Sequence, residues 1–261
     1  MKDITITSLE TITAFDVVTG AYKFTLDELQ NATLSQSQES QEIVGKQGRK
    51  LNSLKRNKAV TVSAANGLVS GGLLELQTGC DFKNEATEVM WVDYLTVEDG
   101  EAETTFKAVG TTGAEIVELF VRNADGTEGA KLTQDATAST GKFAYAPATK
   151  TLSLPSALTD GTEIVVYYKR KIVADVLENS SDVYSGKAML YIDAIGEDVC
   201  ANVYRVQIFI PKADVSGEWS FEMGDNQTIH NFDAEALAGS CTSGKNFFTY
   251  TVFGANTEDA E

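Results

Sequence analysis

Few residues of this chain are of the types that most often carry out catalysis or hold metals. His230 is the only histidine, and the three cysteines, Cys80, Cys200 and Cys241, lie far apart with no CxxC pair. A Ser/His/Asp or Cys/His mechanism would have to use His230, which we expect to be a structural or solvent-facing residue. A lone imidazole and scattered thiols also provide no metal-ligand set and no disulfide framework. The sequence therefore predicts no catalytic residues, no cofactor and no metal site.

Motifs for phosphate and sugar chemistry point the same way. No GxxxxGK[ST] or GxGxxG element follows a predicted strand, so nucleotide binding has no support. The 38 acidic residues offer carboxylate pairs of the kind that glycosidases use, but such pairs are unspecific in a chain this acidic. An enzyme is the least favoured class.

Binding chemistry is concentrated in the segment TLSQSQESQEIVGKQGRKLNSLKRNKAVTVS, residues 33–63. No acid occurs between Ile43 and Leu74, so residues 43–74 carry +6, whereas the rest of the chain carries −23 in a total of −17. The positive charge comes from six side chains: Lys46, Arg49, Lys50, Lys55, Arg56 and Lys58.

Three interpretations of this basic cluster are open. A nucleic-acid site is disfavoured, because the segment contains no aromatic residue for stacking and the acidic chain repels phosphates. A solvated hairpin with surface lysines is the ordinary alternative. The third interpretation is an arm that binds acidic surface on another copy of the same chain, with the Ser/Gln run flexible until assembly orders it.

The secondary-structure elements that position these residues are predicted to be almost all β-strands. Alternating apolar and polar residues, rich in Val, Ile, Thr, Tyr and Phe and broken by Gly, Asn and Asp, recur from end to end. One helix is expected at about Gly67 to Gln77, ending at Gly79, and a short second helix is expected from Asp233 to Gly239. The predicted strands are residues 11–18, 58–63, 89–97, 116–123, 141–146, 151–155, 162–173, 187–195, 203–211, 217–223 and 246–254.

The order of these elements suggests an interrupted domain. Residues 1–84 and 170–254 are expected to form one core domain, and residues 85–169, with short strands and closely spaced turns, are expected to be a β-rich insertion. The polar residues 255–261 are expected to be a disordered acidic tail. The N-terminus lacks the apolar core of a signal peptide, and no apolar run is long enough to span a bilayer, so no membrane partner is predicted.

Two stretches together resemble the tail tube, or major tail, proteins of tailed bacteriophages. Residues 29–79 follow the pattern of a strand, a Gln/Ser/Glu-rich segment, a basic patch, a return strand and a helix that ends near Thr-Gly. Residues 203–254, from VYRVQIFIPKADV to the aromatic NFFTYTVFG, resemble the closing strands of that family. The resemblance covers most of the chain, although its motifs are soft patterns without an invariant signature.

The resemblance implies a tail-tube-like β-sandwich or barrel with one flanking helix. It also implies a structural virion protein, made in the host cytoplasm, that assembles as hexameric rings stacked into a tube for DNA ejection. Its partners would be its own copies, the tape measure protein and, in a contractile tail, a sheath, while DNA would pass without specific binding. By position in the family pattern, Glu39 and Glu42 are candidate lumen-facing acids. The insertion is large, and we expect it on the outside of the tube.

Two other functions stay open. A capsid decoration protein would also be β-rich, acidic and without catalytic residues. A carbohydrate-binding β-sandwich could use Trp91, Trp219 and the nine tyrosines as stacking platforms, although the missing secretion signal weakens this reading.

Overall fold

The computed structural model describes residues 3–221, 229–239 and 244–254, and in this part of the chain nearly every regular element is a β-strand. The all-β prediction is therefore confirmed. The chain divides into two compact units: unit 1 comprises Met1–Phe82 and Leu177–Glu261, and unit 2 comprises Lys83–Val176. Cys241, residues 222–223 of one predicted strand and the expected acidic tail at residues 255–261 lie outside the described residues.

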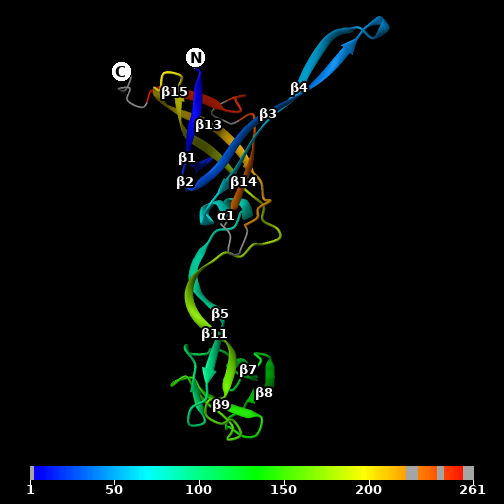
Figure 1. Cartoon of the computed structure of the whole chain (residues 1–261). Coiled ribbons are helices and arrows are strands. Elements are labelled where there is room, and N and C mark those ends of the chain that lie inside the picture. The colour runs from blue at the N-terminus through cyan, green and yellow to red at the C-terminus, as the bar shows by residue number, and fades with distance from the viewer. Residues whose placement is uncertain (1–2, 222–228, 240–243, 255–261) are drawn as a thin grey trace. The chain divides into compact units, whose positions relative to one another are not determined.

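Unit 1 is built on one curved sheet of eight strands (Figure 1). The order of the sheet is β2-β1-β12-β13-β14-β4-β3, and β15 pairs with β13 beside this path. All of the pairings are antiparallel. The strands are β1 (Ile4–Asp16), β2 (Tyr22–Leu26), β3 (Leu29–Val44), β4 (Lys50–Asn66), β12 (Lys187–Asp198), β13 (Val203–Val215), β14 (His230–Ala236) and β15 (Thr249–Gly254).

Strict alternation of side chains sets which face of this sheet is buried. In β12, Ala188, Leu190 and Ile192 point into the core, while their neighbours in sequence point the other way. Successive side chains of a strand lie on opposite faces, so a period of two in the sequence becomes one apolar face. Phe24, Val62 and Phe232 complete the core from other strands.

Helix α1 (Gly71–Thr78) covers this core, close to the predicted position. Ser70 is its N-cap, with the hydroxyl oxygen accepting the N–H of Leu73, and Gly79 closes the C-terminal end in the left-handed conformation, donating its N–H to the carbonyl of Glu75. A Cβ on Gly72 would lie 2.8 Å from the carbonyl oxygen of Lys23. Gly72 is therefore explained by close packing on β2, whereas a Cβ on Gly71 would make only an ordinary contact with the Phe82 ring.

Substitution of Gly79 by alanine is expected to destabilise unit 1 by about 3 kcal/mol. The φ angle of Gly79 is +74°, which costs a residue with a Cβ about 1–2 kcal/mol. The new Cβ would also lie 2.1 Å from the backbone carbonyl of Tyr184, which cannot move without shifting its loop. Gly20→Ala is the matched control, because φ is +70° there and no atom lies within 4 Å of the new Cβ. Urea unfolding measures both variants, and equal losses would contradict the close-packing explanation.

The predicted second helix is wrong. Asp233 is not an N-cap but an exposed residue in the middle of β14, which runs to Ala236. Phe232, Ala234 and Ala236 alternate into the core, and β14 pairs with β4 on one side and β13 on the other. Long-range pairing therefore overrides the local capping signal. Residues 217–220 were predicted to be a strand and lie outside any strand, with only an isolated bridge at Phe221.

Unit 2 has its own seven-stranded sheet, in the order β5-β11-β7-β8-β9-β10-β6. Its longest pairing joins β5 and β11 over fourteen residues each. Buried side chains such as Val97, Leu119 and Ile164 form a core separate from that of unit 1. The strands are β5 (Lys83–Thr96), β6 (Glu101–Glu103), β7 (Ile116–Arg122), β8 (Glu128–Gln134), β9 (Lys142–Ala146), β10 (Thr151–Ser153) and β11 (Glu163–Val176).

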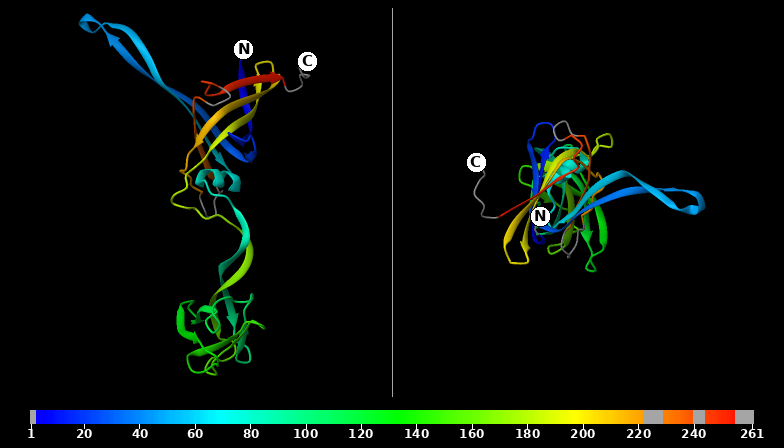
Figure 2. Two further views of the ribbon diagram at one scale, coloured as in Figure 1. Left: turned by 180° about the vertical axis from the view of Figure 1, so that it is seen from behind. Right: turned by 90° about the horizontal axis from the view of Figure 1, so that it is seen from above.

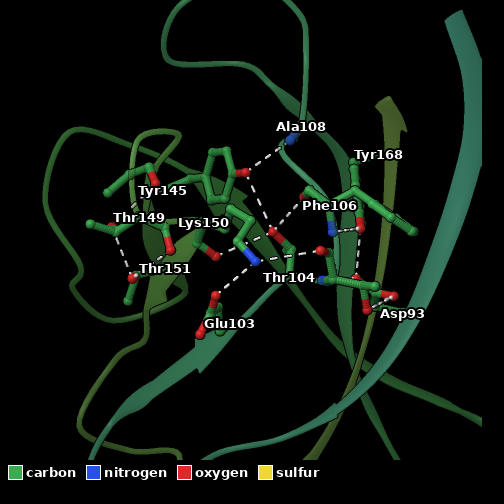
Figure 3. A network of polar contacts seen from close by, with 12 residues as sticks. Asp93, Glu103, Thr104, Phe106, Ala108, Tyr145, Thr149, Lys150, Thr151 and Tyr168 are labelled. Atoms are coloured by element: carbon green, nitrogen blue, oxygen red, sulfur yellow. Dashed lines mark hydrogen bonds and ion pairs between the residues drawn. The ribbon is translucent and has the colours of Figure 1, made fainter. Parts of the chain in front are cut away.

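A polar network inside unit 2 fixes the loop after β6 (Figure 3). The Oδ2 atom of Asp93 accepts the hydroxyl of Tyr168 at 2.7 Å and the N–H of Thr105 at 2.7 Å. The Tyr168 oxygen in turn accepts the N–H of Phe106 at 3.0 Å. Tyr145 repeats this arrangement, since its hydroxyl oxygen accepts the N–H of Ala108 at 2.9 Å. Two tyrosines thus replace strand pairing for the backbone of a loop in which Thr104 and Ala108 are buried.

Burial and hydrogen bonding act in opposite directions on the central carboxylate. Burial alone would raise the pKa of Asp93, but the hydrogen bonds from Tyr168, Thr105 and Trp91 outweigh it and lower that pKa. Burial, with the bond to Asp93, raises the pKa of the Tyr168 hydroxyl. Asp93 is therefore charged in the folded state and holds these hydrogen-bond donors of unit 2 in place.

Among the described residues, no helix is long and apolar enough to cross a membrane.

Candidate functional site

The basic cluster lies on the far end of a long β-hairpin that we call the arm, residues 37–59. Strands β3 and β4 form it, and a short 3-10 turn at Lys46–Gly48 closes its tip. Figures 1 and 2 show the arm extending away from the rest of unit 1. Only Gly45, Ser53 and Ala59 of the arm are partly buried, and its other residues are exposed. The Ser/Gln run that was expected to be flexible is a paired strand here.

The six basic residues are not equivalent in the arm. Lys50 forms an ion pair with Glu42, and Arg56 lies 4.0 Å from the carboxylate of Glu39, which faces it across the ladder. Lys58, at the base of the arm, lies over the ring of Phe247 at 5.7 Å. Half of the cluster thus has a partner within the same chain.

The remaining three basic residues have no acidic partner in the arm, and together with Lys58 they account for its net charge of +4, which is six basic residues minus Glu39 and Glu42. Lys46 and Arg49 flank the tip, and Lys55 stands opposite Ser40. None of the three makes an ion pair within the part of the chain that the structure describes. Exposed ion pairs contribute little to stability, so the pairing of Glu39 and Glu42 does not fix their role, and their lumen position remains a prediction.

The tip of the arm is also apolar, which the charge analysis missed. Ile43, Val44, Leu51 and Leu54 are between 41% and 64% exposed. The signal in the sequence was the pair Ile43-Val44 beside two leucines in an otherwise polar segment. An isolated two-stranded hairpin is marginally stable in water, and an exposed apolar cluster is typical of an interaction site. The arm therefore has both charge and apolar surface to bury against a partner.

A second feature of unit 1 is a groove at the base of the arm, which the sequence analysis also missed. It has a volume of about 610 Å³ and lies over β4, β13 and β14. Three carboxylates line it, those of Asp214, Asp233 and Glu235. The strand register brings these acids together, since Glu235 stands directly opposite Asp214 in β13 and opposite Thr61 in β4. The groove is therefore acidic.

His230 is a structural residue, as expected. It is fully buried in β14, where its Nδ1 atom accepts the N–H of Ser70 at 3.3 Å. Its Nε2 atom lies 2.9 Å from the side-chain oxygen of Gln77, whose amide donates to the carbonyl of Asn231 at 2.8 Å. These contacts tie both ends of α1 to the sheet through a neutral imidazole, and burial lowers the pKa of His230.

Unit 1 is therefore expected to lose stability in mild acid. The folded state disfavours the charged imidazolium form of His230. The contribution of the neutral ring to the free energy of unfolding is therefore complete above the unfolded pKa of about 6.5, and it is lost as the pH falls toward the lowered pKa of the folded state. The loss approaches about 1.4 kcal/mol for each pH unit in that window. Urea unfolding at pH 7.5, 6.5 and 5.5 measures it, with His230→Asn as the control that lacks the titrating ring. Parallel pH profiles for the two proteins would contradict this role.

The two tryptophans proposed as sugar platforms are engaged within their own units. Trp91 packs edge-on against Phe106 with ring centroids 5.1 Å apart, and the guanidinium of Arg170 lies 4.4 Å from the Trp91 ring centroid. Trp219 stacks on Phe221 with centroids 5.0 Å apart. The ring faces that a sugar would stack on are thus partly covered.

Within residues 3–221, 229–239 and 244–254, the thiols and the side chains that could bind a metal add no further site. Cys80 and Cys200 are free, half-buried and exposed respectively. No group of three His, Cys, Asp or Glu side chains with metal-binding geometry occurs among the residues that the structure describes.

Comparison with protein families identifies a family for this chain. The model of the YomU/Tube protein family matches residues 4–250, which is nearly the whole chain. No curated protein matches the sequence.

Proposed function

Since the chain belongs to the YomU/Tube protein family, a phage-derived family of tube proteins, we propose that it is the structural subunit of a phage tail tube. In this proposal it polymerises as six-membered rings that stack around a channel for DNA. Its role is structural rather than catalytic. The arm is the observation that supports this proposal best.

The arm supports polymerisation because it presents a ribbon that its own unit does not cover. A ring or stack made of one protein needs a contact in which one patch meets a different patch on the neighbour. A projecting hairpin with an apolar tip and the unpaired Lys46, Arg49 and Lys55 supplies one such patch. We propose that these residues, with Lys50, Arg56 and Lys58 behind them, form the interface arm.

The charge of the chain suits a conduit for DNA. At a net charge of −17, the subunit offers phosphates few counterion-releasing contacts, so DNA would slide rather than adhere. Glu39 and Glu42 are proposed to face the lumen, and unit 2 is proposed to lie outside the tube, where it does not narrow the channel. Other tail proteins, such as a tape measure and, in a contractile tail, a sheath, would be the partners of the assembled tube in the virion.

Electron microscopy of the purified protein, before and after concentration, tests the proposal. Hollow tubes or six-fold rings are the expected result. A strict monomer that binds glycans would overturn it in favour of a carbohydrate-binding module. A monomer that binds preformed capsids would overturn it in favour of a capsid decoration protein.

A further inference from the structure

The geometry points to the acidic groove of unit 1 as the receptor for the arm of a second copy of this chain. This inference rests on the proposed function, because it requires that the chain polymerises. It assigns the partner surface and the side chains that meet in it. The arm supplies Lys46, Arg49 and Lys55, and the groove supplies Asp214, Asp233 and Glu235.

The groove holds negative charge that the chain does not neutralise. Asp214 and Glu235 are direct cross-strand neighbours in β13 and β14, and like charges in such positions repel. Lys187 stands opposite Asp214 on its other side, in β12, yet neither residue forms an ion pair with another described residue. The carboxylates of Asp233 and Glu235 likewise have no ion-pair partner in the described part of the chain. A cation from outside would relieve this repulsion.

The groove also has the size and the polar lining to hold basic side chains. Its volume of about 610 Å³ falls within the range of roughly 300–1,000 Å³ found for binding pockets. Hydroxyl groups surround the three acids and can accept further ammonium or guanidinium donors. They belong to Thr61, Ser63, Ser185 and Ser216.

The arm cannot reach the groove of its own chain. Thr61 lines the groove and lies in β4, the same strand that carries the arm away from it. Arg49 lies twelve positions before Thr61 and Lys55 lies six, which corresponds to about 40 Å and about 20 Å along an extended strand at roughly 3.3 Å per residue. The β3–β4 ladder keeps this part of the chain extended. These basic side chains therefore cannot enter the groove of their own chain.

Such a contact would propagate. Each copy would insert its arm into one neighbour and keep its own groove for another, so the interface is heterologous and continues from subunit to subunit. The charged residues would select the groove and set the register, while the apolar Ile43, Val44, Leu51 and Leu54 would bury surface beside it.

Reciprocal charge reversal tests the pairing. The groove variant is Asp214→Lys/Glu235→Lys, and the arm variant is Lys46→Glu/Arg49→Glu/Lys55→Glu. The groove variant keeps two like charges at the facing positions 214 and 235, but it loses the opposite charge that Lys187 places across from position 214, so its folding is compared directly with that of the natural chain by thermal unfolding. Each variant alone should form at least tenfold less pelletable polymer than the natural chain. An equal mixture of the two should recover polymer, because each arm then finds a groove of opposite charge.

The controls separate this inference from the proposed function. Glu98→Lys/Asp160→Lys makes the same change in net charge as the groove variant, but at exposed positions of unit 2, and it should polymerise normally. If the natural chain polymerises but the groove variant does so equally well, or the mixture is not rescued, the groove is not the receptor while the tube proposal stands. If the natural chain forms no polymer under any condition, the proposed function fails first. Circular dichroism and thermal unfolding check that every variant is folded.

Discussion

A chain whose arm is cut back to Glu39 and Arg56 and closed by Asn-Gly is expected to remain a folded monomer and to form no tubes. These two residues are cross-strand partners, so a two-residue turn can join them in register. The removed segment, residues 40–55, contains no buried residue. The core contacts of β3 and β4 begin nearer the base, at Leu34 and Val60. The free energy of unfolding should therefore change by no more than about 1 kcal/mol.

The measurement combines urea unfolding with sedimentation and electron microscopy. Ser40→Thr/Ser53→Thr is the matched control, because the hydroxyls of these two residues lie 2.5 Å apart across the ladder and threonine keeps both the hydroxyls and the charge of the arm. The control should form tubes at the natural yield. Normal tubes from the shortened chain would show that the arm has no part in assembly.

Elements with one buried face could be predicted from the sequence. In β12 and β13, apolar and polar residues alternate along the sequence, and side chains two positions apart in a strand lie on the same face of the sheet. The local sequence is therefore enough to predict which face is buried. The helix before Gly79 was likewise predictable from an apolar stripe and a glycine at its end. In these segments the local preference and the tertiary environment agree.

Prediction failed where distant residues decide the structure. The segment around Asp233 contains good helix formers, but pairing with β4 and β13 makes it a central strand. The Ser/Gln run has no buried face, so no pattern reveals that it pairs with the basic strand. The groove depends on register, which places Asp214 opposite Glu235 although they are far apart in sequence. The sequence was enough to indicate the family. The strand around Asp233, the pairing of the Ser/Gln run and the acidic groove could be located only in the structure.

The other large effect is expected in unit 2, where Asp93→Ala should unfold the unit at much lower temperature. The Asp93 carboxylate accepts the Tyr168 hydroxyl, the N–H and hydroxyl of Thr105 and the indole N–H of Trp91. Alanine would leave the buried Tyr168 hydroxyl without its acceptor, which costs about 1–3 kcal/mol, and would also remove the hydrogen bonds from Thr105 and Trp91. We expect a total loss of about 4 kcal/mol, which lowers the Tm of a unit of this size by roughly 20 °C.

Each unit contains one tryptophan, so fluorescence separates them. In a Trp219→Phe background, Trp91 reports the melting of unit 2 alone. Asp160→Ala, at an exposed turn of the same unit, is the control and should shift the Tm by only a few degrees.

The pH dependence of this effect separates charge from packing. Because the folded pKa of Asp93 lies below the unfolded value of about 3.9, the stabilisation that its carboxylate provides is complete above that pH and disappears as the pH falls through the folded value. The difference in the Tm of unit 2 between Asp93→Ala and the natural chain should therefore shrink in strong acid. A difference in Tm that persists there would assign the loss to a cavity rather than to the charge.

Unit 2 has its own core, so the Asp93→Ala variant should still form tubes at temperatures where unit 2 is unfolded. Failure to form tubes under these conditions would give unit 2 a part in assembly.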